Sequence, residues 1–139
     1  MRRIQKILSV ILAIMMVISI VPITASAAPD PNSGVCGDNL TWSFDETTGT
    51  LTISGEGVMY DFPYDDSEWF DLKSEITNVV IEDGVTSIGS SAFELFVNLK
   101  SVTIPESVTV IGAYAFDECD SITKIVLHEG ITKIGEGAF

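Results

Sequence analysis

Residues 99–121 read LKSVTIPESVTVIGAYAFDECDS, and this pattern recurs on both sides at an interval of 23 residues. The preceding unit, 76–98, reads ITNVVIEDGVTSIGSSAFELFVN, and the following unit, 122–139, reads ITKIVLHEGITKIGEGAF, an incomplete copy. The apolar positions that recur in register are Ile76, Leu99 and Ile122; Val79, Val102 and Ile125; Ile81, Ile104 and Leu127; Val85, Val108 and Ile131; and Ile88, Ile111 and Ile134. A fixed period of this kind predicts a solenoid of stacked supersecondary units.

Each unit contains two short extended stretches. In the second unit, residues 102–104 alternate apolar and polar β-branched residues, which predicts a strand with one buried face. Pro105 ends this strand, and a second extended piece holds Val108 and Ile111. A glycine follows in every unit, at Gly89, Gly112 and Gly135. Glycine there permits either a positive φ at a corner or a close approach of the neighbouring coil.

The dipeptide Ala-Phe follows the glycine and places its phenylalanine at Phe93, Phe116 and Phe139. It is expected to form one helical or 3₁₀ turn whose phenylalanine fills the core. One unit alone buries too little apolar surface to offset the ordering entropy of its backbone, so the units must stack. The expected fold class is therefore mainly β, a solenoid of 23-residue coils.

The segment before the repeats, residues 36–75, is expected to cap the first coil. Leu40, Trp42 and Phe44 alternate with polar residues as in a strand, and Leu51 and Ile53 form a return strand, so a β-hairpin is predicted. Its apolar face would cover the first coil, which otherwise exposes backbone and apolar side chains.

Between the hairpin and the repeats, Ser67 is expected to cap a short helix. The apolar side chains that this helix would bury are Trp69, Phe70, Leu72 and Ile76. Trp42 and Trp69 are expected in the core; the alternative is a pair of exposed aromatic rings that stack on sugars.

Residues 1–27 have the layout of a secretory signal peptide, with a basic start, an apolar run and the cleavage motif Ala25-Ser26-Ala27. A membrane anchor is the alternative, but Pro22 and the lack of stop-transfer charges favour cleavage after Ala27. Residues 28–35 are rich in proline and small polar residues and are expected to be a linker. The mature chain is therefore expected outside the cell, secreted or on the cell surface, without membrane insertion.

The net charge of the whole chain is −13, and removal of Arg2, Arg3 and Lys6 with the leader leaves 4 lysines against 20 acidic residues. The mature chain then carries a net charge of −16. Nucleic-acid binding and attraction to anionic lipid both need clustered lysine or arginine, so both classes of function are excluded.

The stretch SVTIPESVTVIGAYAFDEC resembles the BspA-like leucine-rich repeat of bacterial cell-surface and secreted proteins. The resemblance covers residues 76–139, and residues 36–42 and 49–55 are similar to the segment that commonly precedes such repeats. It implies a leucine-rich-repeat solenoid with an N-terminal β-hairpin cap. It also implies adhesion or ligand capture outside the cell, with an extracellular protein or glycan as partner. In such families the repeat also serves as a passive stalk or accompanies a separate catalytic domain.

The candidate partner-binding face is the outer side of the first strand of each coil. Its residues are Asn78, Val80, Ser101, Thr103, Lys124 and Val126. Stacked in parallel columns, they could recognise an extended partner by area, or they could simply be solvated. A structural spacer that presents a downstream domain, possibly catalytic, is the second hypothesis.

No residues form a recognisable catalytic, cofactor-binding or metal-binding pattern, so the chain is not expected to be an enzyme. The acidic residues Asp61, Asp65, Asp66, Glu68 and Asp71 lack the spacing of a calcium loop and are expected to be a solvated surface. His128 replaces Pro105 one unit later and is expected in a solvated turn.

Two further expectations concern the cysteines and the end of the sequence. Cys36 and Cys119 lie in unrelated contexts, so no disulfide is expected, and Cys119 takes the core position of Phe96 as a buried thiol. The sequence stops at Phe139 inside the third coil, which predicts a longer protein and, for this chain, self-association through the uncapped coil.

Overall fold

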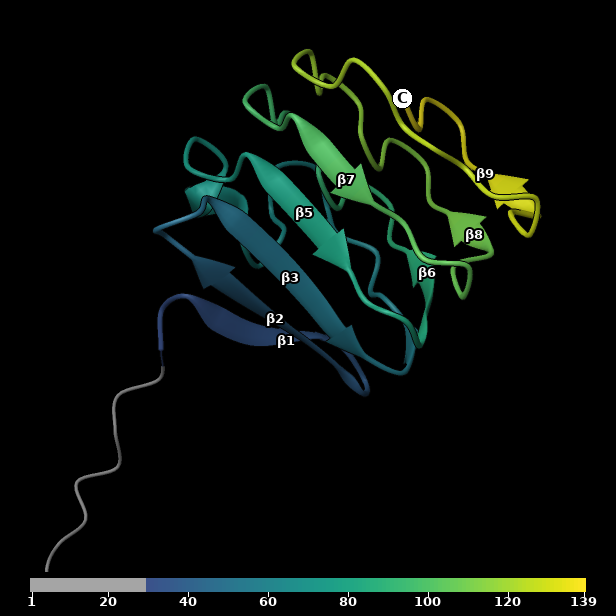
Figure 1. Ribbon diagram of the computed structural model, residues 1–139, viewed down its shortest axis with the longest axis horizontal. Helices are drawn as coiled ribbons and strands as arrows, with labels where there is room; N and C mark the ends of the chain where they lie inside the picture. Colours follow the sequence, from purple (N-terminus) through teal and green to yellow (C-terminus); the bar gives the residue numbers. More distant parts are fainter. Residues whose placement is uncertain (1–29) are drawn as a thin grey trace, which may run out of the picture.

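The computed structural model describes residues 30–139, which form two β-sheets around one core (Figure 1). Sheet A contains, in spatial order, β1 (Ser33–Gly37), β2 (Leu40–Asp45), β3 (Thr50–Gly55), β5 (Asn78–Ile81) and β7 (Ser101–Thr103). Sheet B contains β4 (Gly57–Val58), β6 (Val85–Ile88), β8 (Val110–Ile111) and β9 (Lys133–Ile134). The predicted signal peptide, residues 1–27, lies outside the described residues.

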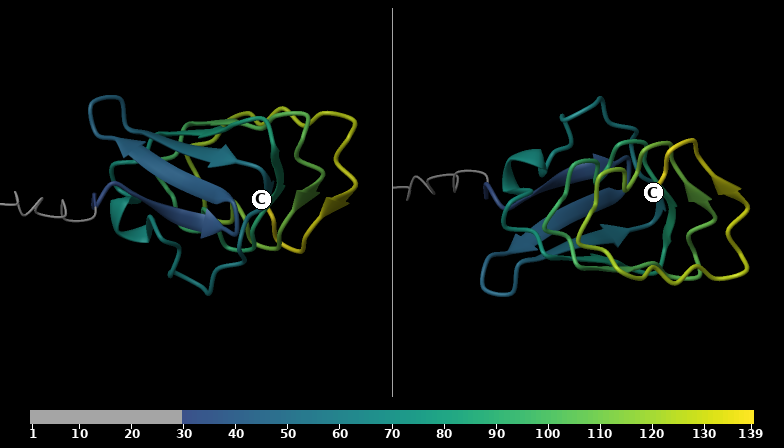
Figure 2. Two further views of the ribbon diagram at one scale, coloured as in Figure 1. Left: turned by 90° about the horizontal axis from the view of Figure 1, so that it is seen from below. Right: turned by 90° about the horizontal axis from the view of Figure 1, so that it is seen from above.

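The sequence period of 23 residues is the offset between neighbouring strands. In sheet A, Asn78 of β5 pairs with Ser101 of β7, and in sheet B, Val110 of β8 pairs with Lys133 of β9, all in parallel. The first two repeats therefore each supply one strand to each sheet, and successive units lie side by side (Figures 1 and 2).

The first strand of the third unit is missing. Residues 124–126 have no strand assignment, although β9 continues sheet B in the same unit. The apolar side chains expected on the inner face of this segment are poorly covered, since Leu127 is 38% exposed and Ile125 is only half-buried. Without a buried inner face, little packing free energy holds this segment in strand geometry.

The predicted hairpin is present, because β2 and β3 pair antiparallel from Leu40 to Asp45. β3 then pairs in parallel with β5, so the hairpin and the repeats share one sheet. β1 adds a further strand, and the expectation of a linker over residues 28–35 was wrong from Ser33 onward. Gly34 explains this, because a Cβ at this position would lie 2.6 Å from the indole nitrogen of Trp42.

A column of aromatic rings runs through the core. Phe93 stacks on Phe116 with 5.2 Å between ring centroids, and Phe116 stacks on Phe139 at 5.6 Å. Trp69 extends the column by stacking on Phe93, with 5.4 Å between ring centroids. Trp69 also packs edge-on against Trp42 of the hairpin, with 5.9 Å between ring centroids. Both tryptophans are buried, which confirms their predicted place in the core.

The expected helical cap at Ser67 was wrong. The only helical element in residues 30–139 is the 3₁₀ turn η1 (Phe70–Leu72), which has no side-chain cap. The Ser67 hydroxyl is buried without a hydrogen-bond partner, and the Ser67 carbonyl accepts the N–H of Phe70 instead. The segment is held by Trp69, whose indole N–H donates to the Ala92 carbonyl at 2.9 Å.

The Ala-Phe segments form a third set of hydrogen bonds between units, and they are turns rather than helices. The N–H groups of one unit donate to carbonyls of the next, as Ser91 to Ala113, Phe93 to Ala115, Leu95 to Asp117, Tyr114 to Glu136 and Phe116 to Ala138. A regular helix would use these N–H groups within its own turns. The backbone is left-handed at Ser91, Leu95, Tyr114, Glu118 and Gly137.

The recurring glycine is required by a close approach between units. A Cβ at Gly112 would collide with the backbone of Ser90, and a Cβ at Gly135 would collide with the backbone of Ala113. Neither glycine has a positive φ. Glycine is needed at this corner because the backbone of the neighbouring unit leaves no room for a Cβ, and not because of an unusual backbone conformation.

Replacing Phe116 by alanine should remove the centre of the aromatic column. We expect a loss of about 3–5 kcal/mol in the free energy of unfolding, since Phe116 is buried between two rings. Urea denaturation measures this, with Phe139→Ala as the control, because Phe139 is 53% exposed and stacks on one side only. An equal loss in both variants would contradict the role of the column.

Replacing Glu118 by glycine should stabilise the fold relative to Glu118→Ala by about 1 kcal/mol. Glu118 is exposed and has a φ of 54°, which strains any residue with a Cβ. The two variants remove the same charge, so the difference between their urea midpoints isolates the backbone strain. A less stable glycine variant would show that the turn relaxes in solution.

The thiols should be unreactive in the folded protein. Burial, assisted by the charge of Glu68, raises the pKa of Cys36 to about 12, and burial raises the pKa of Cys119 to about 12. Because these values lie above the ordinary value of 9.0, the thiols favour folding below about pH 9 and this contribution is lost as the pH rises toward 12. We expect slow alkylation by iodoacetamide at pH 8 and a large acceleration in urea; equal rates would refute burial.

Candidate binding surfaces

The outer face of sheet A brings together four of the six residues that the sequence indicated. Asn78 and Val80 point outward from β5 because Val79 and Ile81 are buried on the other face. Each lies opposite its counterpart on β7, Asn78 beside Ser101 and Val80 beside Thr103. The Ser101 hydroxyl donates to the Asn78 side-chain oxygen at 2.8 Å. Outward side chains therefore form columns across these two strands, and their role in binding stays a prediction.

Lys124 and Val126, the remaining two candidates, are exposed but belong to the segment without strand geometry. The structure does not pair them with β7. Their membership of the face stays a prediction.

The hairpin contributes to the same face, which the sequence analysis missed. Thr52 of β3 lies opposite Val80, Ser43 of β2 lies opposite Thr52, and Ser33 of β1 lies opposite Ser43. One row across five strands contains Ser33, Ser43, Thr52, Val80 and Thr103, and a second row contains Asp45, Thr50, Asn78 and Ser101. The polar alternation of the hairpin strands was visible in the sequence, but only the register places them beside β5.

The chemistry of this face is that of hydroxyl, amide and aliphatic groups. Asp45, in the turn between β2 and β3, is the only charged side chain in the two rows. Hydrogen bonds from the Thr48 hydroxyl and the Thr47 N–H hold the pKa of Asp45 below its usual value, so it is ionised at neutral pH.

A groove of about 540 Å³ crosses the outer side of sheet B. Val58, Val110 and Lys133 line it, with Asp61 and Glu136 also at its walls. The Asp61 carboxylate accepts the N–H of Ser90 at 2.7 Å, and this bond, with the positive charge of Lys133, lowers the pKa of Asp61. Asp61 therefore ties residues 58–62 to the first repeat.

The acidic cluster of the sequence analysis is a solvated surface, as predicted. All five of its side chains are exposed, namely Asp61, Asp65, Asp66, Glu68 and Asp71. In the part of the chain that the structure describes, no three His, Cys, Asp or Glu side chains lie together as a metal site would require.

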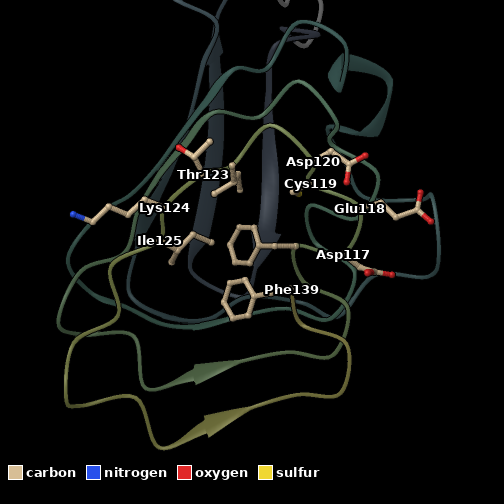
Figure 3. Close-up of a pocket in the computed structure, with 10 residues that line it drawn as sticks. Asp117, Glu118, Cys119, Asp120, Thr123, Lys124, Ile125 and Phe139 are labelled. Atoms are coloured by element: carbon tan, nitrogen blue, oxygen red, sulfur yellow. The ribbon is translucent and has the colours of Figure 1, made fainter.

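The C-terminal end of the stack holds an opening of about 580 Å³ (Figure 3). Ile125 and Phe139 line it, whereas the carboxylates of Asp117 and Glu118 point away (Figure 3). Cys119 also borders it and is only half-buried, with its thiol donating to the Phe93 carbonyl at 3.1 Å. Self-association through this end stays a prediction.

His128 lies at a turn, as expected, but the expectation that it is solvated was wrong, because the residue is half-buried and its Nε2 is buried without a hydrogen-bond partner. Its Nδ1 accepts the N–H of Gly130 at 3.0 Å, and Glu106 and Glu129 are the other residues of this shallow site. The two cysteines are free; Cys36 is buried, whereas Cys119, expected as a buried thiol, is only half-buried. Among residues 30–139 there is no helix with the length and apolar character that a membrane crossing requires.

Comparison with known proteins agrees with this geometry. Residues 66–139 match the family described as BspA type leucine rich repeat region (6 copies). A leucine-rich repeat protein from Eubacterium ventriosum shares 29% sequence identity with a TM-score of 0.68, over 74% of this chain and 27% of that chain. A leucine-rich repeat protein from Bacteroides ovatus shares 28% identity with a TM-score of 0.49, over 74% of this chain and 32% of that chain.

The chain thus spans less than a third of the length of either solved protein. No curated protein matches it. The family match nevertheless covers more than half of the sequence and includes all three repeats. On this evidence the chain belongs to the BspA-type leucine-rich repeat family.

Proposed function

We propose that the chain is a binding module, secreted or displayed on the cell surface, that captures an extracellular protein or glycan through the outer face of sheet A. The observation that carries this proposal is a pair of rows in register, one across five strands and the other across four. Repeats of this family generally serve in protein interaction, and BspA-type proteins are commonly surface or secreted bacterial proteins.

The proposal includes a leucine-rich-repeat solenoid of 23-residue coils with the hairpin as its N-terminal cap. Trp42 supports the cap, because it packs edge-on against Trp69 at the base of the aromatic column. The parallel pairing of β3 with β5 supports it as well, since the hairpin then takes the place of a preceding coil. A cap of this kind protects the apolar end of a repeat stack.

The size of the face limits the affinity that it can supply. The five strands of sheet A are three to six residues long. At a spacing of about 4.8 Å they give a footprint on the order of 400 Å². A stable protein interface covers about 800 Å² on each partner, so this face alone predicts weak binding. Further repeats stacked in the same register would enlarge the outer face of sheet A.

A pull-down of extracellular-matrix proteins and of whole bacterial cells tests the proposal. The test variant carries aspartate at Val80, Thr103 and Val126, and the matched control carries aspartate at Thr86, Thr109 and Thr132 on the side of sheet B. We expect saturable capture by the natural chain and by the control. Capture by the test variant should be at least about tenfold weaker, because buried unpaired carboxylates cost about 1.4 kcal/mol or more.

Circular dichroism must show that all three proteins are folded. Equal capture by the test variant and the natural chain would show that the outer face of sheet A is not the binding surface. No capture by any folded protein would favour the alternative, a structural spacer that presents another domain.

A further inference from the structure

The hairpin strands differ from a simple cap in what they expose. A cap needs only its inner face, where Leu40, Trp42 and Phe44 are buried. The outer face of the hairpin carries side chains of the same type as β5 and β7, at the same level of the sheet, in Ser33, Ser43, Thr41, Thr50 and Thr52. The surface is therefore chemically continuous across the boundary between hairpin and repeats.

Carboxylates border this surface at the carboxyl ends of its parallel strands, whereas its two rows contain one charged side chain, Asp45. Glu56 follows β3, Glu82 and Asp83 follow β5, and Glu106 follows β7, and all four are exposed. Parallel strands end at one edge of a sheet, so these charges form a line along that edge. Residues 30–139 contain all 20 acidic residues and only 4 lysines. The potential over the face is therefore negative, although Asp45 is the only charged side chain in its two rows.

Two classes of partner fit this arrangement poorly. A polyanion would be repelled by the bordering carboxylates and would find no basic side chain in the two rows. A glycan would find hydroxyl groups but no ring on which a sugar could stack, because no aromatic side chain stands in either row. A protein segment with basic side chains fits the surface, because its backbone can lie on the uncharged row from Ser33 to Thr103 while its charges reach the carboxylates at the edge.

From these observations we infer that the partner is an extended, cationic protein segment, and that the hairpin is part of the surface that binds it. The segment lies across the strands along the row from Ser33 to Thr103, and its basic side chains meet the line of carboxylates at the edge. The inference rests on the proposed function and narrows its partner to one class.

A 16-residue peptide of alternating lysine and threonine is the probe, and peptides with serine or glutamate in place of lysine are its controls. Fluorescence anisotropy at 0.15 M salt measures the dissociation constants, since screening over about 8 Å then suppresses general attraction to an acidic protein. We expect the lysine peptide to bind at least tenfold more tightly than either control peptide.

Variants of the full chain locate the site. Ser43 is exposed at the centre of the hairpin face, and Val58 is exposed on sheet B. Ser43→Lys should weaken binding of the lysine peptide at least fivefold and Ser43→Glu should strengthen it, because each new charge lies beneath the bound segment. Val58→Lys and Val58→Glu change the net charge equally and should shift the dissociation constant less than twofold.

Equal effects at Ser43 and Val58 would overturn the inference, because binding would then depend on net charge alone. Tight binding of the serine or glutamate peptide, or no binding of the lysine peptide, would overturn it as well. If the Ser43→Lys variant captures partners in the pull-down as well as the natural chain does, the proposed binding function is supported. The inference that the hairpin is part of the binding surface is then wrong.

Discussion

The stacking of Phe93 on Phe116 sets the distance on which the rest of the structure depends. Rings can stack at 5.2 Å only if the backbones that carry them approach almost to the spacing of hydrogen-bonded strands. The glycine corner and the small buried residues Ala92 and Ala115 make room for this approach. The 23-residue period is therefore the length of chain that returns the backbone to the same place one strand spacing further on.

The hairpin joins an antiparallel pair of strands to the parallel strands of the repeats. It is antiparallel within itself, yet β3 must present a parallel edge to β5. Trp69 then takes the place that a phenylalanine holds in the repeats, and its indole N–H satisfies the Ala92 carbonyl. The junction is less regular than the repeats, since the Trp42 indole N–H and the Ser67 hydroxyl are buried without partners. Each such group costs about 1–3 kcal/mol, which the surrounding apolar packing must offset.

Most periodic features were predictable from the sequence, but the first strand of the third unit and a helical Ala-Phe turn were expected from the period and do not form. The strands of the repeats, the hairpin and the buried tryptophans follow from alternation and recurrence. The strand at Ser33 depends on contact between Gly34 and Trp42, which no local pattern reveals. The failure at Ser67 has a similar cause, because burial of Trp69 outweighed the preference for a capped helix. Of the candidate face, the outward residues of β5 and β7 were found, but the hairpin's share required the register between β3 and β5.

The hydrogen bonds of the Ala-Phe turns give the molecule a direction. Those that join two units run from an N–H group of one unit to a carbonyl of the next, so each unit offers donors on one side and acceptors on the other. Two copies joined head to head at these turns would set donors against donors or acceptors against acceptors. Inserting or deleting a whole unit in the same orientation would keep the donors of each unit facing the acceptors of the next. The number of repeats can therefore change by whole units in evolution, whereas the orientation in which the units stack cannot change.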